Sequence, residues 1–260
     1  MSAYSFLDLF DGYKSYYQHR ADWGSVYKEE GFGFHTCVFD IKETIHLDEG
    51  ETLDGGNCLF RWRAEGWKSK CHSSTELSEE EDKMFVMARN SRIKNMHIEC
   101  ALEGILMNDN TRIENVVMRD CEEECITTRG TKNVIKNNRF YLCQDKCIQL
   151  SGAKNVYIEN NLFKHAYRPI SGKDDKRGAD KPVYVRNNRC KNCEIMIRGQ
   201  KDHKIFAGGN SLIKGECLFE TMDQSVIYDE GKNSVVLAEK LCEDGTKNIR
   251  ATKSKKKTKK

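Results

Sequence analysis

Three consecutive glutamates are the first residues in this sequence whose type and spacing suggest chemistry. They are Glu122, Glu123 and Glu124 in the segment RDCEEECITTRG, which also contains Arg129. About one repeat earlier, Glu103 in ALEGILMND occupies nearly the equivalent position. Glu103, Glu123 and Glu124 together would offer the oxygen ligands that a hard divalent cation requires. A solvated acidic face would use the same residues, so both interpretations stay open.

Basic side chains follow the acidic run at similar spacing. QDKCIQL contains Lys146 and Gln149, and HAYRPISG contains Arg168. Acidic and basic residues alternating along one groove would suit an acidic sugar polymer bridged by a metal ion. The alternative is a ladder of exposed salt bridges, each contributing about 0 to 1 kcal/mol.

The elements that would position these side chains repeat along the chain. The repeats can be aligned on six residues: Asn95, Asn115, Asn137, Asn160, Asn187 and Gly209. Self-similarity at this period indicates a solenoid. Six positions after each of them stands a small residue: Ala101, Cys121, Cys143, Ala166, Cys193 and Gly215. We expect these small residues to form a column that faces the interior.

Each repeat combines alternating apolar positions, an Asn-rich corner and a second short apolar strand. Helical spacing does not fit these runs, and the recurring residue is Cys or Ala rather than the Leu of a leucine-rich horseshoe. The sequence therefore predicts an all-β fold, a right-handed parallel β-helix, over residues 36–245. Stacked turns bury one continuous core, and asparagines at the same corner can hydrogen-bond to one another. We expect residues 1–35 to form an N-terminal cap and residues 246–260 to form a lysine-rich disordered tail.

Charge and hydropathy limit the partners of the chain. The net charge is +3, but six lysines lie in the last eight residues, so the remainder carries 3 − 6 = −3. We therefore expect no nucleic-acid partner except through the lysine-rich tail. No run approaches the ~18 apolar residues of a membrane span, and the first residues do not have the pattern of a signal peptide. The localisation is left open.

The twelve cysteines recur at the period of the repeat rather than as an obvious disulfide framework. Cys121 and Cys143 are one period apart, and so are Cys125 and Cys147. We interpret these four as stacked core residues that could cross-link if oxidised. The CKNC segment beginning at Cys190 has no second pair at ligand spacing, which favours a structural role over a zinc site.

Several motifs resemble the family 3 pectate lyases. IHLDEGETLDGG, the acidic stretch after Cys71, and DKMFVMARNSRIKN are similar to the opening of that family. DCEEECITTRG, QDKCIQLSGAKNVYIEN and HAYRPISG resemble three of its later segments, in the same order, over about residues 44–188. The resemblance implies a Ca²⁺-dependent enzyme that cleaves polygalacturonate, or a related acidic polysaccharide, by β-elimination.

The resemblance also implies a role for each matching residue. Glu103, Glu123 and Glu124 correspond to calcium ligands, whereas Lys146, Gln149 and Arg168 correspond to substrate-binding positions. Arg129 stands where the family has a lysine base, and Lys146 is the second candidate base. Because Arg gives up its proton rarely, the alternative is a non-catalytic β-helix that binds carbohydrate or serves in an assembly such as a virion.

Overall fold

The computed structural model describes residues 35, 37–62, 83–172, 182–200, 202–222, 225–236 and 249–251. The chain divides into two compact units, Met1–His35 and Thr36–Lys260. The cap expected over residues 1–35 lies outside the described residues except for His35. Most of the expected lysine-rich tail also lies outside them, but Ile249–Ala251 form a strand instead of a disordered segment.

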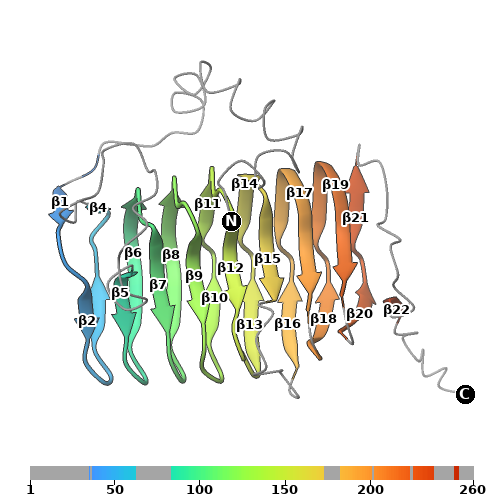
Figure 1. The fold of residues 1–260 in the computed structure, drawn as a ribbon, viewed down its shortest axis with the longest axis horizontal. Coiled ribbons are helices and arrows are strands. Elements are labelled where there is room, and N and C mark those ends of the chain that lie inside the picture. The colour runs from blue at the N-terminus through green and yellow to red at the C-terminus, as the bar shows by residue number, and fades with distance from the viewer. Residues whose placement is uncertain are drawn as a thin grey trace, which may run out of the picture. The chain divides into compact units, whose positions relative to one another are not determined.

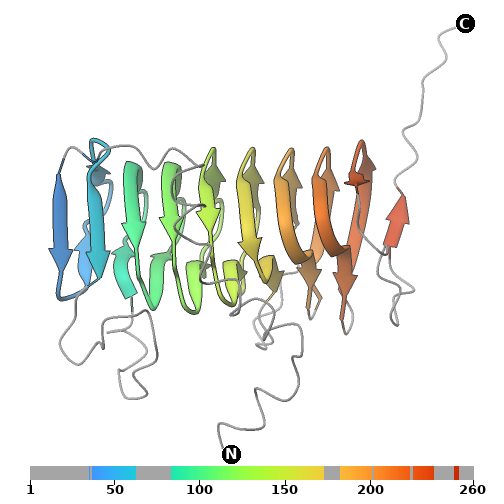
Figure 2. The same ribbon diagram turned by 90° about the horizontal axis from the view of Figure 1, so that it is seen from above.

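The described part of the second unit is a right-handed parallel β-helix, which confirms the fold class expected from the repeats. Strands stack turn upon turn along the coil, and every strand pairing is parallel (Figures 1 and 2). No helix in the described part of the chain has the length and hydropathy needed to span a membrane.

Each full turn contributes to three faces, not to the two strands per repeat that the sequence indicated. The first face is formed by β2 (Ile45–Leu47), β5 (Lys83–Met87), β7 (Glu103–Met107), β9 (Glu124–Thr128), β12 (Lys146–Leu150), β15 (Arg168–Gly172) and the second halves of β17 (Arg189–Gly199) and β19 (Ser211–Thr221). The second is formed by β3 (Thr52–Asp54), the first halves of β6 (Arg92–Glu99) and β8 (Arg112–Arg119), then β10 (Val134–Lys136), β13 (Val156–Glu159), β16 (Val183–Arg186), β18 (Lys204–Gly208), β20 (Val226–Gly231) and β22 (Ile249–Ala251). The third is formed by β1 (Val38–Ile41), β4 (Leu59–Trp62), the second halves of β6 and β8, β11 (Arg139–Tyr141), β14 (Leu162–Ala166), the first halves of β17 and β19, and β21 (Ser234–Val236).

The corners between faces explain the recurring asparagines. Five of the six alignment residues are asparagines with φ between 53° and 58°, and the sixth, Gly209, has φ 68°. This left-handed conformation is the one that Asn and Gly adopt at least cost, so these residues turn the chain from the second face to the third. The sequence thus marked six turns of this corner column, which continues at Lys232 with φ 62°. The β-rich run of each repeat, which the sequence indicated as a single strand, bends at this corner and contributes to two faces.

A second asparagine column, one residue further along, lies inside the coil. Asn138, Asn161, Asn188 and Asn210 are at most 2% exposed, and the side-chain oxygen of each accepts from the backbone N–H one turn earlier. The expected hydrogen bonding along a corner is therefore present, and it is strongest in this buried ladder. In the exposed column, Asn115 donates to Asn95 at 3.3 Å.

The expected inward column of small residues is confirmed. Ala101, Cys121 and Cys143 are fully buried, and Ala166 and Cys193 are at most 3% exposed. A Cβ atom added at Gly215 would lie 2.2 Å from the Cys193 carbonyl oxygen, so this position has no room for a side chain.

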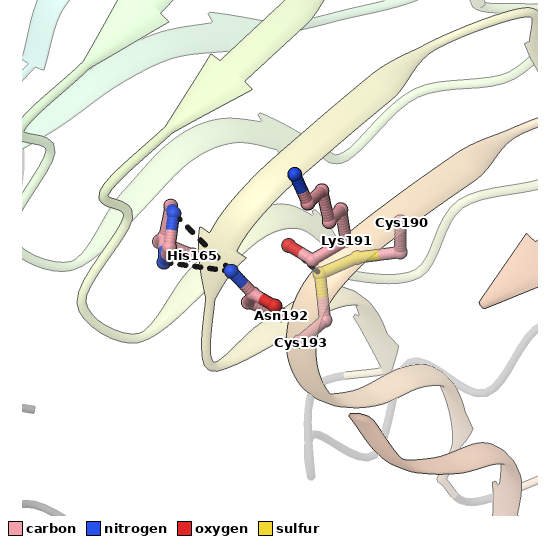
Figure 3. The surroundings of a disulfide bond; sticks show 5 residues. All are labelled: His165, Cys190, Lys191, Asn192 and Cys193. Carbon is pink, nitrogen blue, oxygen red and sulfur yellow. Dashed lines mark hydrogen bonds between the residues drawn. A yellow bond between two sulfur atoms is a disulfide. The ribbon is translucent and has the colours of Figure 1, made fainter. Parts of the chain in front are cut away.

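Two disulfides join pairs of described residues, and Cys217 is disulfide-bonded as well. Cys37 and Cys58 are bonded across neighbouring turns, with Cα atoms 4.7 Å apart. Cys190 and Cys193 are bonded within one corner, where Asn192 approaches the His165 ring of the preceding turn (Figure 3). This bond confirms that the CKNC segment is structural.

The buried ladder leads to a stability prediction. Asn161→Ala removes the acceptor for the backbone and side-chain amides of Asn138. The side-chain amide still donates to the Ile113 carbonyl, but the buried backbone N–H loses its partner. We expect the free energy of unfolding to fall by about 2 to 4 kcal/mol. Denaturant titration measures this. Asn160→Gly is the control, because Gly tolerates the φ of 55° at this exposed corner, and it should cost less than about 1 kcal/mol. Equal losses in both variants would contradict the role of the ladder.

Candidate functional site

The outer side of the first face carries one column of charged residues. In-register pairing aligns Lys83 with Glu103, Glu124 with Lys146, and Lys146 with Arg168. The pairing of Ile105 with Ile126 also aligns Glu103 with Glu124. Five successive turns therefore present the sequence +, −, −, +, + at the first position of the strand. The sequence motifs identified four of these five residues.

The three carboxylates expected to bind a cation lie together. One oxygen each from Glu103, Glu123 and Glu124 lies within 4.8 Å of the other two. Glu123 is exposed, Glu103 is partly buried and Glu124 is 7% exposed. Hard oxygen donors at this separation match the 2.3–2.6 Å ligand distances of Ca²⁺, so the donor set fits that ion. Glu122, the first of the three consecutive glutamates, is not part of this group.

Two lysines already neutralise part of the cluster. Lys83 Nζ lies 3.1 Å from a Glu103 carboxylate oxygen, and Lys146 Nζ lies 2.8 Å from Glu124 Oε1. Gln149 also donates to Glu124. Lys146 contacts Asp145 at 2.7 Å, and Asp145 lies 3.8 Å from Arg168. The column is thus an ion-pair network as well as a possible cation site, and the two interpretations made from the sequence are not exclusive.

These contacts set the direction of two pKa shifts. Burial raises the pKa of Glu124, and the attraction of Lys146 only partly opposes it. Burial disfavours the charged form of Lys146, but Glu124 and Asp145 outweigh it and raise the pKa. A lysine held in its ammonium form is a poor proton acceptor. The network therefore argues against Lys146 as a base and for Lys146 as a binding cation.

Arg129 lies at the other end of the same strand. It follows Thr128, the last residue of β9, whereas Glu124 is the first. Five strand positions correspond to about 16 Å, so Arg129 is not beside the glutamates as the sequence order suggested. Thr128 is fully buried whereas Arg129 is partly exposed, so Arg129 lies on the outer side. An extended Arg129 side chain and a sugar residue would have to bridge the gap to the carboxylates.

Buried polar atoms without a hydrogen bond occur on this outer side as well as elsewhere in the described chain. The Nε atoms of Arg129 and Arg168 and the Oγ1 atom of Thr127 are buried and make no hydrogen bond within the described chain. Buried polar groups of native proteins are usually paired, so such atoms indicate where a ligand would complete the hydrogen bonding. All three belong to β9, to β15 or to the residue directly after β9.

The motifs missed a group of residues beyond Arg168. Arg168 donates to the Tyr167 hydroxyl at 2.7 Å, and its guanidinium lies 4.2 Å from the centre of that ring. On the next turn Arg198 pairs with Glu220 at 2.8 Å. Burial and the nearby Arg168 lower the pKa of Arg198. The sequence motifs also missed Lys83. It stands 20 residues before Glu103, which is one repeat length, and this spacing could have identified it.

Residues 35–201 match the family described as Pectate lyase, which is more than half of the chain. This chain belongs to the pectate lyase family. The match contains Glu103, Glu123, Glu124, Arg129 and Arg168, and it confirms the family expected from the motifs. No curated protein matches the sequence.

Solved structures of similar fold include three polysaccharide lyases or pollen proteins, each of low sequence identity. The catalytic domain of pectate lyase PelI from Erwinia chrysanthemi is 19% identical, with a TM-score of 0.48, and covers 83% of this chain and 97% of its own. An alginate lyase from Paenibacillus sp. str. FPU-7 is 12% identical, with a TM-score of 0.45 and coverages of 83% and 98%. The cedar pollen allergen jun a 1 is 13% identical, with a TM-score of 0.46 and coverages of 77% and 65%.

Glu194 makes the stability of this region depend on pH. Burial, then the charge of Glu216, raises its pKa from 4.5 to about 7. Between these values the folded chain holds a proton that the unfolded chain has released. The stabilisation is therefore complete below pH 4.5 and is lost as the pH rises through about 7. We expect the melting temperature to fall less steeply over this range in Glu194→Gln than in the parent. Glu43→Gln, at an exposed carboxylate, should keep the parental slope. An unchanged slope in Glu194→Gln would refute the assignment.

Proposed function

We propose that this chain cleaves an acidic polysaccharide, polygalacturonate or a related uronan, by Ca²⁺-dependent β-elimination. Membership of the pectate lyase family supports lyase-type cleavage of a polysaccharide. The finer claims concern the cation, the substrate and the residue roles, and they rest on the outer side of the first face.

The observation that carries the proposal is the column of charges over five turns. Carboxylates of Glu103, Glu123 and Glu124 lie within 4.8 Å of one another, and two cations, Lys146 and Arg168, follow on the next two turns. A polyanionic chain needs positive charge along its length. A cluster of negative charge beside it is useful only if a cation links the two. Bound Ca²⁺ would neutralise a uronate carboxylate and make the proton at C5 more acidic.

The chain's own residues would carry the remaining steps. Lys146, Gln149 and Arg168 would bind and orient the carboxylates and hydroxyls of the substrate. Arg129, in its neutral guanidine form, would accept the C5 proton and become a guanidinium, the C4–O4 bond would break, and the electron pair of the C5–H bond would form the new C4=C5 double bond. The leaving oxygen would take a proton from solvent. The buried, unpaired Nε of Arg129 is consistent with a guanidinium oriented toward a ligand.

A non-catalytic role is the second candidate, and one observation favours it. Lys83 and Lys146 already neutralise the charges of Glu103 and Glu124. The ion pairs therefore account for these glutamates without any catalytic role. In that case the same surface would bind an acidic carbohydrate without cleaving it.

Product formation tests the proposal directly. We expect the ultraviolet absorbance of unsaturated uronide to rise when the protein meets polygalacturonate with Ca²⁺, and to stop rising when a chelator is added. The double variant Glu123→Gln with Glu124→Gln should lose calorimetric Ca²⁺ binding and at least about 100-fold in activity, since two charged ligands are gone. Glu122→Gln is the matched control and should retain both. Polymer binding without any product would favour the non-catalytic role.

Substitutions at Arg129 and Lys146 can identify the residue that accepts the C5 proton. Arg129→Lys should preserve or raise the rate, because an ammonium is displaced into a useful pKa range more readily than a guanidinium. Arg129→Ala should lower kcat by about 100-fold or more. Lys146→Ala should instead raise KM, since we assign it to binding. Full activity in Arg129→Ala together with lost kcat in Lys146→Ala would transfer the role of base to Lys146.

A further inference from the structure

Four buried cysteines lie inside the coil behind the charged column. Cys121, Cys125, Cys143 and Cys147 are all fully buried, and none is in a disulfide. They form two Cys-x3-Cys pairs on successive turns, separated by 17 residues. This is close to the ligand spacing of structural zinc sites, which use two short-spaced cysteine pairs joined by a longer loop.

The sulfur atoms of three of these cysteines lie close together. Those of Cys125, Cys143 and Cys147 lie within 4.8 Å of one another, and Cys125 and Cys143 are 2.8 Å apart. The Cys121 thiol is within hydrogen-bonding reach of both Cys125 and Cys143. In a tetrahedral site with Zn–S distances of 2.3 Å, the sulfurs lie about 3.8 Å apart. The cluster already has nearly this size.

Two disulfides explain this arrangement less well than a metal does. Partners in a disulfide need to face only one another, as Cys37 and Cys58 do across neighbouring turns. Here the sulfurs of Cys125 and Cys143 approach each other diagonally at 2.8 Å, and the Cys147 sulfur lies within 4.8 Å of both. Three sulfurs within 4.8 Å of one another suit a single ion, with Cys121 one turn before Cys143 as the fourth ligand.

We propose that Cys121, Cys125, Cys143 and Cys147 bind one thiophilic divalent ion, of which zinc is the type. On binding, four S–H bonds break, four protons pass to solvent and four thiolates coordinate the ion. The complex carries a charge of −2, and Lys146, directly before Cys147, places a positive charge on the other side of the same strand.

The role of this ion would be to fasten two turns together. Cys125 follows Glu124 and Cys147 follows Lys146, so the ion would hold the starts of β9 and β12 in register from inside. It would stiffen the wall whose outer side carries the candidate site. The inference is independent of the proposed lyase activity, because a non-catalytic protein would bind the ion equally.

The test uses the full chain, purified under reducing conditions without added metal and then titrated with Zn²⁺ or Co²⁺. We expect one equivalent to bind, with the absorption of tetrahedral cobalt thiolate, a higher melting temperature and protection of four thiols from alkylation. Cys143→Ser should lose these signals, and the control Cys100→Ser, at a free cysteine outside the cluster, should keep them.

Three results would overturn the proposal. The first is a failure of the reduced parent protein to bind either ion. The second is unchanged stoichiometry and absorption in Cys143→Ser. The third is the recovery of these four residues as two disulfides by mass spectrometry of the native protein. If Cys143→Ser does not fold, the absorption and thiol protection of the parent protein still decide the question.

Discussion

In-register parallel stacking is the constraint on which the rest of this structure depends. Every residue lies beside the residue one turn earlier, so a side chain in one repeat sets the surroundings of its equivalents in the next. The corner column of residues with positive φ, from Asn95 to Gly209, keeps the register, and a buried asparagine ladder satisfies backbone groups that a corner would otherwise leave unpaired. A side chain that does not fit its position therefore disturbs the packing of the equivalent side chains on both neighbouring turns.

The same stacking concentrates charge. Aligning Glu103 with Glu124 brings like charges about 4.8 Å apart at the backbone, which is unfavourable unless cations follow in the same column. Lys83, only 1% exposed, and Lys146 supply them at the two ends of the acidic pair. Breaking a buried ion pair costs about 3 to 5 kcal/mol. A divalent ion at the carboxylates would have to coexist with these lysines or displace them, and this competition would weaken its binding.

The wall between β9 and β12 has two chemistries on its two sides. Charged residues at the strand starts face outward, and the thiols of the neighbouring positions face inward, one residue away. Hard oxygen ligands and soft sulfur ligands select different metals, so two sites this close would not compete for the same ion. Packing on the inner side and electrostatics on the outer side thus act on the same short strands.

The sequence by itself determined the β-helix, one column of corners, the inward column of small residues and the grouping of Glu103, Glu123 and Glu124. Each of these follows from counting in periods, because stacking turns a sequence separation of one repeat into a spatial contact. Tertiary structure alone decided the contacts that the repeat length does not predict. Lys83 reaches Glu103 and the carboxylates raise the pKa of Lys146, both through side-chain contacts. Arg129 lies about 16 Å from Glu124 because the strand between them is extended. Cys125 meets Cys143 diagonally because side-chain direction, rather than spacing, decides which neighbours touch.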